Sequence, residues 1–117
     1  MSMLITVVEL PEFIRRSEKL LKDDERSKLI FYLSTNPKAG TLIQGTGGIR
    51  KLRWAREGKG KSGRVRVIYF YYDEDMPLFL LTVFRKGEKS NVSKAERNEL
   101  AKLTKILIAS YKDNNNE

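Results

Sequence analysis

The sequence predicts an α+β fold in which an antiparallel sheet of about four strands is covered by two N-terminal helices and a C-terminal helix. Two observations predict this fold. Runs of β-branched and aromatic residues, typical of strands, alternate with stretches whose apolar residues recur every three or four positions, as in amphipathic helices. These runs follow the order strand, two helices, three strands, helix. With 117 residues, the chain is expected to form one domain, residues 1–117, of which 112–117 form a frayed tail.

A strand and two helices are expected in the first third of the chain. Residues 3–10, MLITVVEL, are apolar and rich in β-branched side chains, which predicts a buried strand. Pro11 suits the first turn of the helix that follows. The acidic pair Asp23–Asp24 offers an N-cap for the second helix, and Asn36–Pro37 ends it, because the residue before a proline avoids helical backbone angles.

Three strands and a helix are expected after a glycine-rich loop at residues 38–48. The strands are apolar or alternating runs joined by hairpin connections, at residues 49–55, 64–72 and 78–84. Ser93 and Glu96 have the spacing of a capping box, which predicts the start of the last helix. The apolar face of that helix comprises Leu100, Leu103, Ile106, Leu107 and Tyr111.

The positive charge is concentrated in one short segment. The chain has a net charge of +8, yet residues 50–66 alone contain eight basic residues and one acid, a net charge of +7. The other 100 residues are nearly balanced, at +1. Concentrated positive charge favours a polyanion as the partner, either nucleic acid or an acidic membrane surface.

The segment AREGKGKS, residues 55–62, has the loose spelling of a phosphate-binding loop. Such a loop leads from a strand into a helix whose N-terminus meets the phosphates. Here a glycine and then nine residues rich in β-branched and aromatic types follow Ser62, which predicts a strand. We therefore interpret the segment as a hairpin tip with outward-pointing lysines rather than as a nucleotide site.

The composition excludes several classes of site. The sequence contains no cysteine and no histidine, so disulfides, thiol catalysis and metal sites built on these residues are excluded. The acids at residues 73–75 are better explained by a hairpin turn than by a metal, and no cofactor is expected. No apolar run is long enough to span a bilayer and no secretory signal is recognisable, so we expect a cytoplasmic protein without a membrane partner.

Alternation along the predicted strands brings basic side chains together. Lys51 and Arg53 share one face of their strand, and Arg64 and Arg66 share one face of the next. If these strands pair, both basic pairs converge on one surface, which the basic residues after the third strand would complete. The alternative is a solvated sheet face on which basic residues only keep an edge soluble.

Such a surface suits RNA cleavage without histidine. The 2′-hydroxyl of RNA can attack its own neighbouring phosphate, so a protein needs only to position the backbone, neutralise the charge that grows on the phosphoryl oxygens and move protons. Arginine neutralises that charge through its planar fork of donors. Crowding by like charges lowers the pKa of a lysine, which would make it a better proton carrier at neutral pH.

Four segments, IQGTGGIRKLRWA, GKGKSG, RVIYFYYDE and LLTVFRKGE, together resemble the HigB-type toxins of the RelE superfamily, which belong to bacterial type II toxin–antitoxin pairs. The resemblance covers roughly residues 4–105. It implies a small RelE-like α+β fold that enters the A site of the 70S ribosome and cleaves mRNA there as a metal-independent endoribonuclease, which inhibits translation. It also implies a HigA-like antitoxin that neutralises the toxin, and contact with operator DNA only through the toxin–antitoxin complex.

The resemblance also implies roles for residues of this sequence. The catalytic set would be Lys51, Arg53, Arg66 and Lys86. The two arginines would stabilise the transition-state phosphate, and one of the two lysines would carry a proton. Contacts to RNA would come from Arg50, Lys59, Lys61, Arg64, Phe84 and Arg85.

Three aromatic positions bear on these roles. Family members often have tyrosine where this chain has Phe84, which can stack on a base but cannot transfer a proton. Some relatives use a catalytic histidine or tyrosine near the C-terminus, whereas here histidine is absent and Tyr111 falls on the apolar face of the predicted helix. Trp54 lies on the predicted core side of its strand, which indicates packing rather than base stacking.

Two other functions remain open from the sequence. The chain could be a non-catalytic basic module that binds RNA or an antitoxin. It could also be a ParE-like toxin that acts on DNA gyrase through the same fold. The strand residues Lys51, Arg53 and Arg66 favour cleavage over the gyrase function, because a gyrase-directed relative needs no phosphate-binding cluster.

Overall fold

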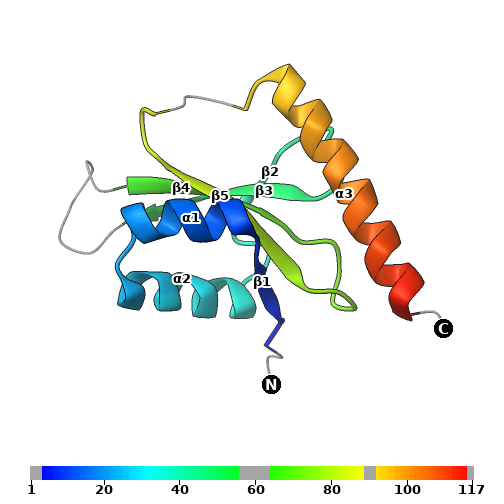
Figure 1. Cartoon of the computed structure of the whole chain (residues 1–117), viewed down its shortest axis with the longest axis horizontal. Helices are drawn as coiled ribbons and strands as arrows, with labels where there is room; N and C mark the ends of the chain where they lie inside the picture. Colours follow the sequence, from blue (N-terminus) through cyan, green and yellow to red (C-terminus); the bar gives the residue numbers. More distant parts are fainter. Residues whose placement is uncertain (1–3, 56–63, 89–91, 116–117) are drawn as a thin grey trace.

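The computed structural model describes residues 4–55, 64–88 and 92–115. Three helices and five strands occur in this part of the chain (Figure 1). In chain order they are β1 (Val7–Glu9), α1 (Pro11–Leu20), α2 (Asp23–Thr35), β2 (Thr41–Leu42), β3 (Ile49–Ala55), β4 (Arg64–Phe70), β5 (Leu78–Arg85) and α3 (Lys94–Asn115). The strands form one sheet in the order β1-β5-β4-β3-β2. The predicted α+β fold, with two N-terminal helices and a C-terminal helix, is thus confirmed.

The centre of the sheet is the antiparallel set of β3, β4 and β5 that the sequence predicts. The edges differ from the predicted antiparallel sheet. β1 pairs with β5 in parallel, with Val7 opposite Leu78. β2 adds an edge strand that the sequence did not predict, with Thr41 opposite Lys51. A strand of two residues is too short to show a period, and the composition of β1 specifies neither its partner nor its direction.

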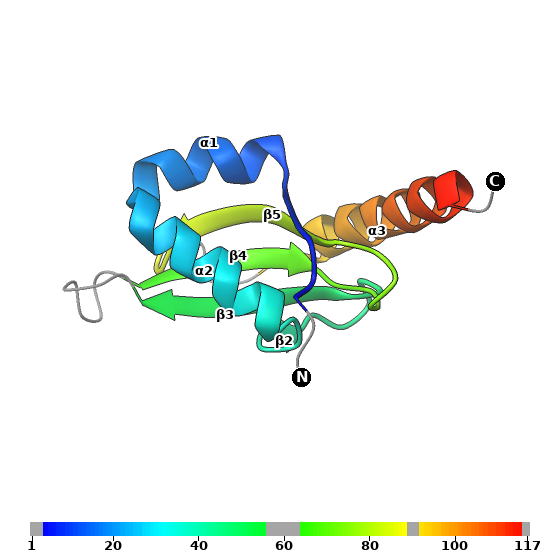
Figure 2. The same cartoon turned by 90° about the horizontal axis from the view of Figure 1, so that it is seen from below.

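Helices cover both faces of the sheet. α1 and α2 lie together on one face, and α3 lies apart from them on the other (Figure 1 and Figure 2). Alternation along β4 divides the core between the two faces. Val65, Val67 and Tyr69 belong to the core under α1 and α2. Ile68 and Phe70 belong to the core under α3, so this central strand is buried on both sides.

Most helix boundaries match their capping signals. α1 begins at Pro11 and α2 ends at Thr35, just before the Asn-Pro pair, as predicted. The predicted capping box precedes α3: the Ser93 hydroxyl accepts the N–H of Glu96, and the Glu96 carboxylate accepts the N–H of Ser93, both at 3.1 Å. Within the described residues, no helix combines the length and apolarity needed to cross a bilayer.

The start of α2 differs from the prediction. Asp23 and Asp24 are already helical, and the N-cap is Lys22. The backbone N–H of Lys22 donates to the carboxylate of Glu25 at 2.9 Å, so the acid three residues into the helix fixes its start. The two aspartates lie in the first turn, where negative charge is favoured by the helix dipole.

The end of α3 also differs from the prediction. The helix continues to Asn115, so residues 112–115 are helical rather than part of a frayed tail. Within these residues, the Nζ of Lys112 lies 3.8 Å from the carboxylate of Asp73 and 5.1 Å from the ring centroid of Tyr72. The last turns of α3 are thereby attached to the connection between β4 and β5.

A buried tyrosine fixes the loop that follows α2. The Tyr69 hydroxyl donates to the carbonyl of Pro37 at 2.8 Å and accepts the N–H of Gly40 at 2.8 Å. Tyr69 is fully buried, and burial raises the pKa of its hydroxyl. A Cβ at position 40 would lie 2.9 Å from the Tyr69 ring, which requires glycine there. The loop leading to β2 and β3 is therefore held against β4.

Candidate nucleic-acid interface

Two arginines face each other near the centre of the sheet. Arg53 on β3 is directly opposite Arg66 on β4, and Arg66 is in turn opposite Phe84 on β5. Because directly opposite side chains project to the same face, these three residues form a row across the strands. The row lies on the face that carries Ile68 and Phe70, which is the face covered by α3 further along the strands.

Two adjacent rows place three more cations around this pair. In one row, Lys51 is opposite Ile68. In the other row, Arg64 lies between Ala55 and Lys86, whose backbone N–H donates to the Arg64 carbonyl at 3.1 Å. Arg66 is therefore the middle residue of the three rows. The five cations, called the basic patch below, are Lys51, Arg53, Arg64, Arg66 and Lys86.

No acid balances the basic patch in the part of the chain that the structure describes. There, none of its five members has a carboxylate within salt-bridge distance. Like charges directly opposite across antiparallel strands repel, so the pairing of Arg53 with Arg66 costs stability. A bound polyanion would offset this repulsion. The patch therefore has the character of an anion-binding surface rather than of an ion-pair network.

Arg66 has a hydrogen-bond donor without a partner. Its side chain is half-buried, and its Nη1 atom is shielded from solvent and unpaired among the described residues. Burial, followed by the charges of Arg53 and Arg64, lowers the pKa of Arg66. A guanidinium stays protonated in proteins, so the lowered pKa reflects an unfavourable environment for the charge. A phosphate bound at the exposed part of this guanidinium would stabilise that charge.

Arg50 and Arg85 are not part of the basic patch. Alternation puts both on the opposite face, where Arg50 is across from Tyr69 and Arg85 is across from Val65. Arg50 Nη1 donates to the carbonyl of Gly40 at 2.8 Å, which ties it to the loop after α2. Arg85 lines a hollow beside α1. The structure thus separates these two arginines from the residues with which the sequence grouped them for RNA contact.

Three other residues expected to touch RNA fall into two groups. Phe84 lies on the patch face but is only 6% exposed and packs in the core under α3, which leaves little of its ring for base stacking. Lys59 and Lys61 lie outside the described residues. The strand β4 begins at Arg64, so a strand and not a helix follows the AREGKGKS segment, as predicted.

Two aromatic side chains and one acid that the sequence analysis considered make structural contacts. The ring of Trp54 lies 5.4 Å from that of Tyr32 and packs against the core under α1 and α2, as predicted. Tyr111 packs against the core under α3, also as predicted. Asp73 accepts the N–H of Asp75 at 2.9 Å, a bond typical of a turn.

An open groove of about 570 Å³ adjoins the basic patch. Its apolar lining includes Ile68 and Phe84 of the sheet, together with residues of the first half of α3. Its acidic lining comprises Glu12, Glu96 and Glu99. Phe84 lies next to Arg66, so the acidic groove and the basic patch are neighbours on one face. The sequence did not reveal the groove, because its walls come from α1, β4, β5 and α3.

A comparison with protein-family models decides the family. The model described as the RelE toxin of the RelE/RelB toxin–antitoxin system matches residues 14–116. The chain belongs to the RelE toxin family. Among solved structures, this RelE-family chain is similar to the free form of E. coli toxin RelE carrying two arginine-to-alanine substitutions, with a TM-score of 0.54. At 18% identity over 74% of this chain and 88% of that one, the similarity shows a shared fold.

The predicted membership of the RelE superfamily is therefore confirmed, whereas the HigB subgroup and the residue roles stay predictions. The surface of this RelE-family chain offers a specific chemistry. Arginine forks and lysine amines surround one point, and the sequence contains neither histidine nor cysteine. Such a site can hold an anion, neutralise charge that grows on it and transfer protons through an amine.

Proposed function

We propose that this chain is a HigB-type toxin of a type II toxin–antitoxin pair and that it cleaves mRNA in the A site of the translating ribosome. The family match and the shared fold support the first part of the proposal. The observation that carries the second part is the position of Arg66 at the middle of the basic patch, directly opposite Arg53 and beside the rows of Lys51 and Arg64. A cationic centre without a neighbouring acid among the described residues suits a backbone phosphate.

In this proposal the 2′-hydroxyl of the RNA is the nucleophile. Its oxygen bonds to the neighbouring phosphorus as the bond from phosphorus to the 5′-oxygen of the next nucleotide breaks. The 2′-oxygen loses a proton, and the departing 5′-oxygen gains one. Negative charge grows meanwhile on the nonbridging oxygens, and the guanidinium groups of Arg53 and Arg66 would stabilise it from directly opposite positions.

Lys51 and Lys86 are suited to the two proton transfers. They lie at opposite corners of the three rows, with Arg66 between them. In-line displacement places the attacking and leaving oxygens on opposite sides of the phosphorus. One lysine would accept the 2′-proton, and the other would donate a proton to the 5′-oxygen. Phe84 has no hydroxyl and therefore cannot accept or donate a proton in this reaction.

The ribosome and its message would be the targets in the cytoplasm. A HigA-like antitoxin would neutralise the toxin, and operator DNA would be reached only through the complex of the two proteins.

Cell-free translation with the purified protein tests the proposal. We expect the message to be cut within the codon in the A site, and only when ribosomes are present. Arg66→Lys keeps the charge but loses the planar fork of donors, so it should slow cleavage by about a hundredfold while ribosome association persists. The control variant is Lys105→Ala, which removes a cation from an exposed position of α3 outside the patch.

Intact message at high protein concentration would contradict catalysis and leave a basic RNA- or antitoxin-binding module as the function. Inhibition of purified gyrase by the same preparation would favour the ParE-like alternative. Loss of ribosome association by Arg66→Lys, in step with cleavage, would make Arg66 an anchor rather than a transition-state contact.

A further inference from the structure

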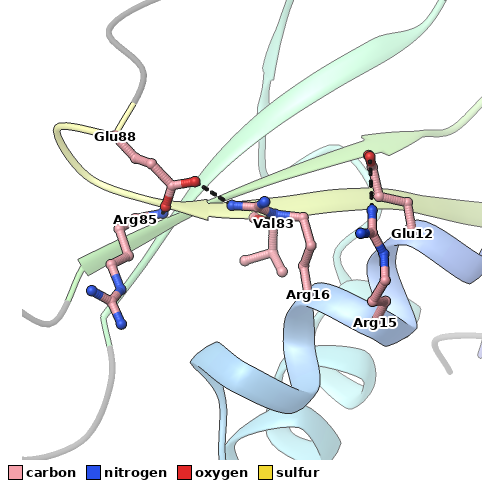
Figure 3. Close-up of polar contacts among 6 residues, drawn as sticks. All are labelled: Glu12, Arg15, Arg16, Val83, Arg85 and Glu88. Carbon is pink, nitrogen blue, oxygen red and sulfur yellow. Dashed lines mark hydrogen bonds and ion pairs between the residues drawn. The ribbon is translucent and has the colours of Figure 1, made fainter.

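An arginine of α1 reaches the end of β5. Arg16 Nε donates to the backbone carbonyl of Val83 at 2.6 Å, and Arg16 Nη2 forms an ion pair with Oε2 of Glu88. Figure 3 shows the Arg16 side chain extending from the helix across the strand to Glu88. The neighbouring Arg15 instead pairs with Glu12 on its own helix. Arg16 thus links the first helix to the segment that follows the last strand.

Glu88 also closes a turn around Lys86. The Glu88 backbone N–H donates to the carbonyl of Arg85 at 3.1 Å, while its Oε1 atom accepts the Arg85 N–H at 3.2 Å. Gly87 has φ +90°, a left-handed backbone that suits the third residue of such a turn. The hydrogen bond from the Arg85 N–H, followed by that from Arg16, lowers the pKa of Glu88. One carboxylate therefore joins the turn to α1.

Lys86 is held between this turn and β4. It is the second residue of the turn, and its own N–H donates to the Arg64 carbonyl at 3.1 Å. Arg16 and Glu88 line one hollow with Arg85 on the face that carries α1 and another with Thr82 and Phe84 on the patch face. Their hydrogen bonds go to the backbone of Val83 and Arg85, the strand end that carries Lys86.

Stability alone is a poor explanation for this pair. The Arg16 and Glu88 side chains are 32% and 42% exposed, and ion pairs at such exposure contribute little to the free energy of unfolding. A lysine side chain is long and flexible, so its ammonium is placed only as well as its backbone is held. The residues Arg16 and Glu88 fix that backbone from two directions.

We propose that Arg16 and Glu88 are positioning residues that hold the turn at residues 85–88 so that Lys86 projects toward the other four members of the basic patch. The proposal rests on the proposed cleavage of RNA, to which it adds two residues that contact the backbone on either side of Lys86. Their effect on the reaction passes through Lys86.

Amide hydrogen exchange in the free protein tests the positioning without any assay of activity. Arg16→Ala and Glu88→Gln should each speed exchange of the Lys86 N–H by about tenfold or more, because the turn opens more often. Arg15→Ala removes a cation one position away that does not reach β5, so it should leave this exchange unchanged. Unchanged Lys86 exchange in both Arg16→Ala and Glu88→Gln, with folded protein by circular dichroism, would overturn the proposal.

Single-turnover cleavage on programmed ribosomes tests whether the effect passes through Lys86. Arg16→Ala and Glu88→Gln should slow cleavage by about tenfold to a hundredfold, with ribosome affinity no lower than that of Arg15→Ala. In a Lys86→Ala background, either change should have almost no further effect. Additive losses in that double-mutant cycle would overturn the proposal. A wild type that protects the Lys86 amide but never cuts the message would refute the cleavage function while leaving the turn contacts intact.

Discussion

Arg53 and Arg66 are directly opposite each other on β3 and β4, and neither has a carboxylate within salt-bridge distance among the described residues. The chain therefore maintains a repulsive pair at the middle of its sheet. Repulsion of this kind is expected where a protein binds an anion, because the ligand supplies the missing negative charge.

Removal of one of these two arginines should therefore make the folded protein more stable and at the same time slow the cleavage of RNA. We expect Arg53→Ala to raise the free energy of unfolding by about 0.2–1 kcal/mol, because a like-charge pair is lost. The same variant should cut ribosome-bound message far more slowly. Urea denaturation measures the first effect, with Lys105→Ala as the control. A clear destabilisation relative to that control would show that the Arg53 side chain contributes packing instead.

The patch should also be visible in the salt dependence of binding. Lys51→Ala should weaken binding to single-stranded RNA and reduce the slope of log affinity against log salt by about 0.7, the value for one lost phosphate contact. Fluorescence anisotropy over a range of salt concentrations measures this slope. If the slope of Lys51→Ala equals that of Lys105→Ala, Lys51 makes no phosphate contact.

The hydroxyl of Tyr69 should matter for stability. Tyr69→Phe removes both hydrogen bonds of the hydroxyl and leaves the Gly40 N–H unpaired, which should lower the free energy of unfolding by about 1–3 kcal/mol. Tyr72→Phe removes the same hydroxyl from a ring that is 44% exposed, and is the matched control. Equal unfolding midpoints for the two variants would show that the hydroxyl contacts contribute nothing.

The same tyrosine should give the protein a limit at alkaline pH. Burial raises the pKa of Tyr69 above its ordinary value of 10.0, so the native state holds the proton to a higher pH than the unfolded chain does. This contribution to stability is fully present below pH 10.0 and is lost as the pH rises through the folded pKa. Tyrosinate absorbance should show a late titration that Tyr69→Phe reduces but does not remove, because burial also raises the pKa of Tyr71. A full tyrosinate titration at the ordinary value would contradict the burial of this hydroxyl.

Short-range sequence patterns predicted most of the helices and strands and which basic side chains share a face of the sheet. The alternation of RKLRWA and RVRVIYF predicted which side chains share a face, and the register of β3 with β4 places Arg53 beside Arg66 on that shared face. The same rule separates Arg50 from Lys51, since consecutive strand residues point to opposite faces. The prediction that Arg50 contacts RNA rests on its charge rather than on its position in the strand.

Contacts between distant segments were beyond the reach of the sequence. The parallel pairing of β1 with β5 depends on how the intervening chain packs, and no property of VVE alone encodes it. The ion pair of Arg16 with Glu88 joins residues 72 positions apart, and neither residue has a distinctive neighbourhood in the sequence. The acidic groove beside Phe84 arises only when α3 folds back over the sheet.

The order in which the segments are synthesised gives the ion pair of Arg16 with Glu88 a further meaning. Arg16 is made early, but the lysine it helps to place and the acid it contacts come after the last strand. A nascent polypeptide released before residue 86 would lack one corner of the cationic surface and would leave Arg16 without its counter-ion.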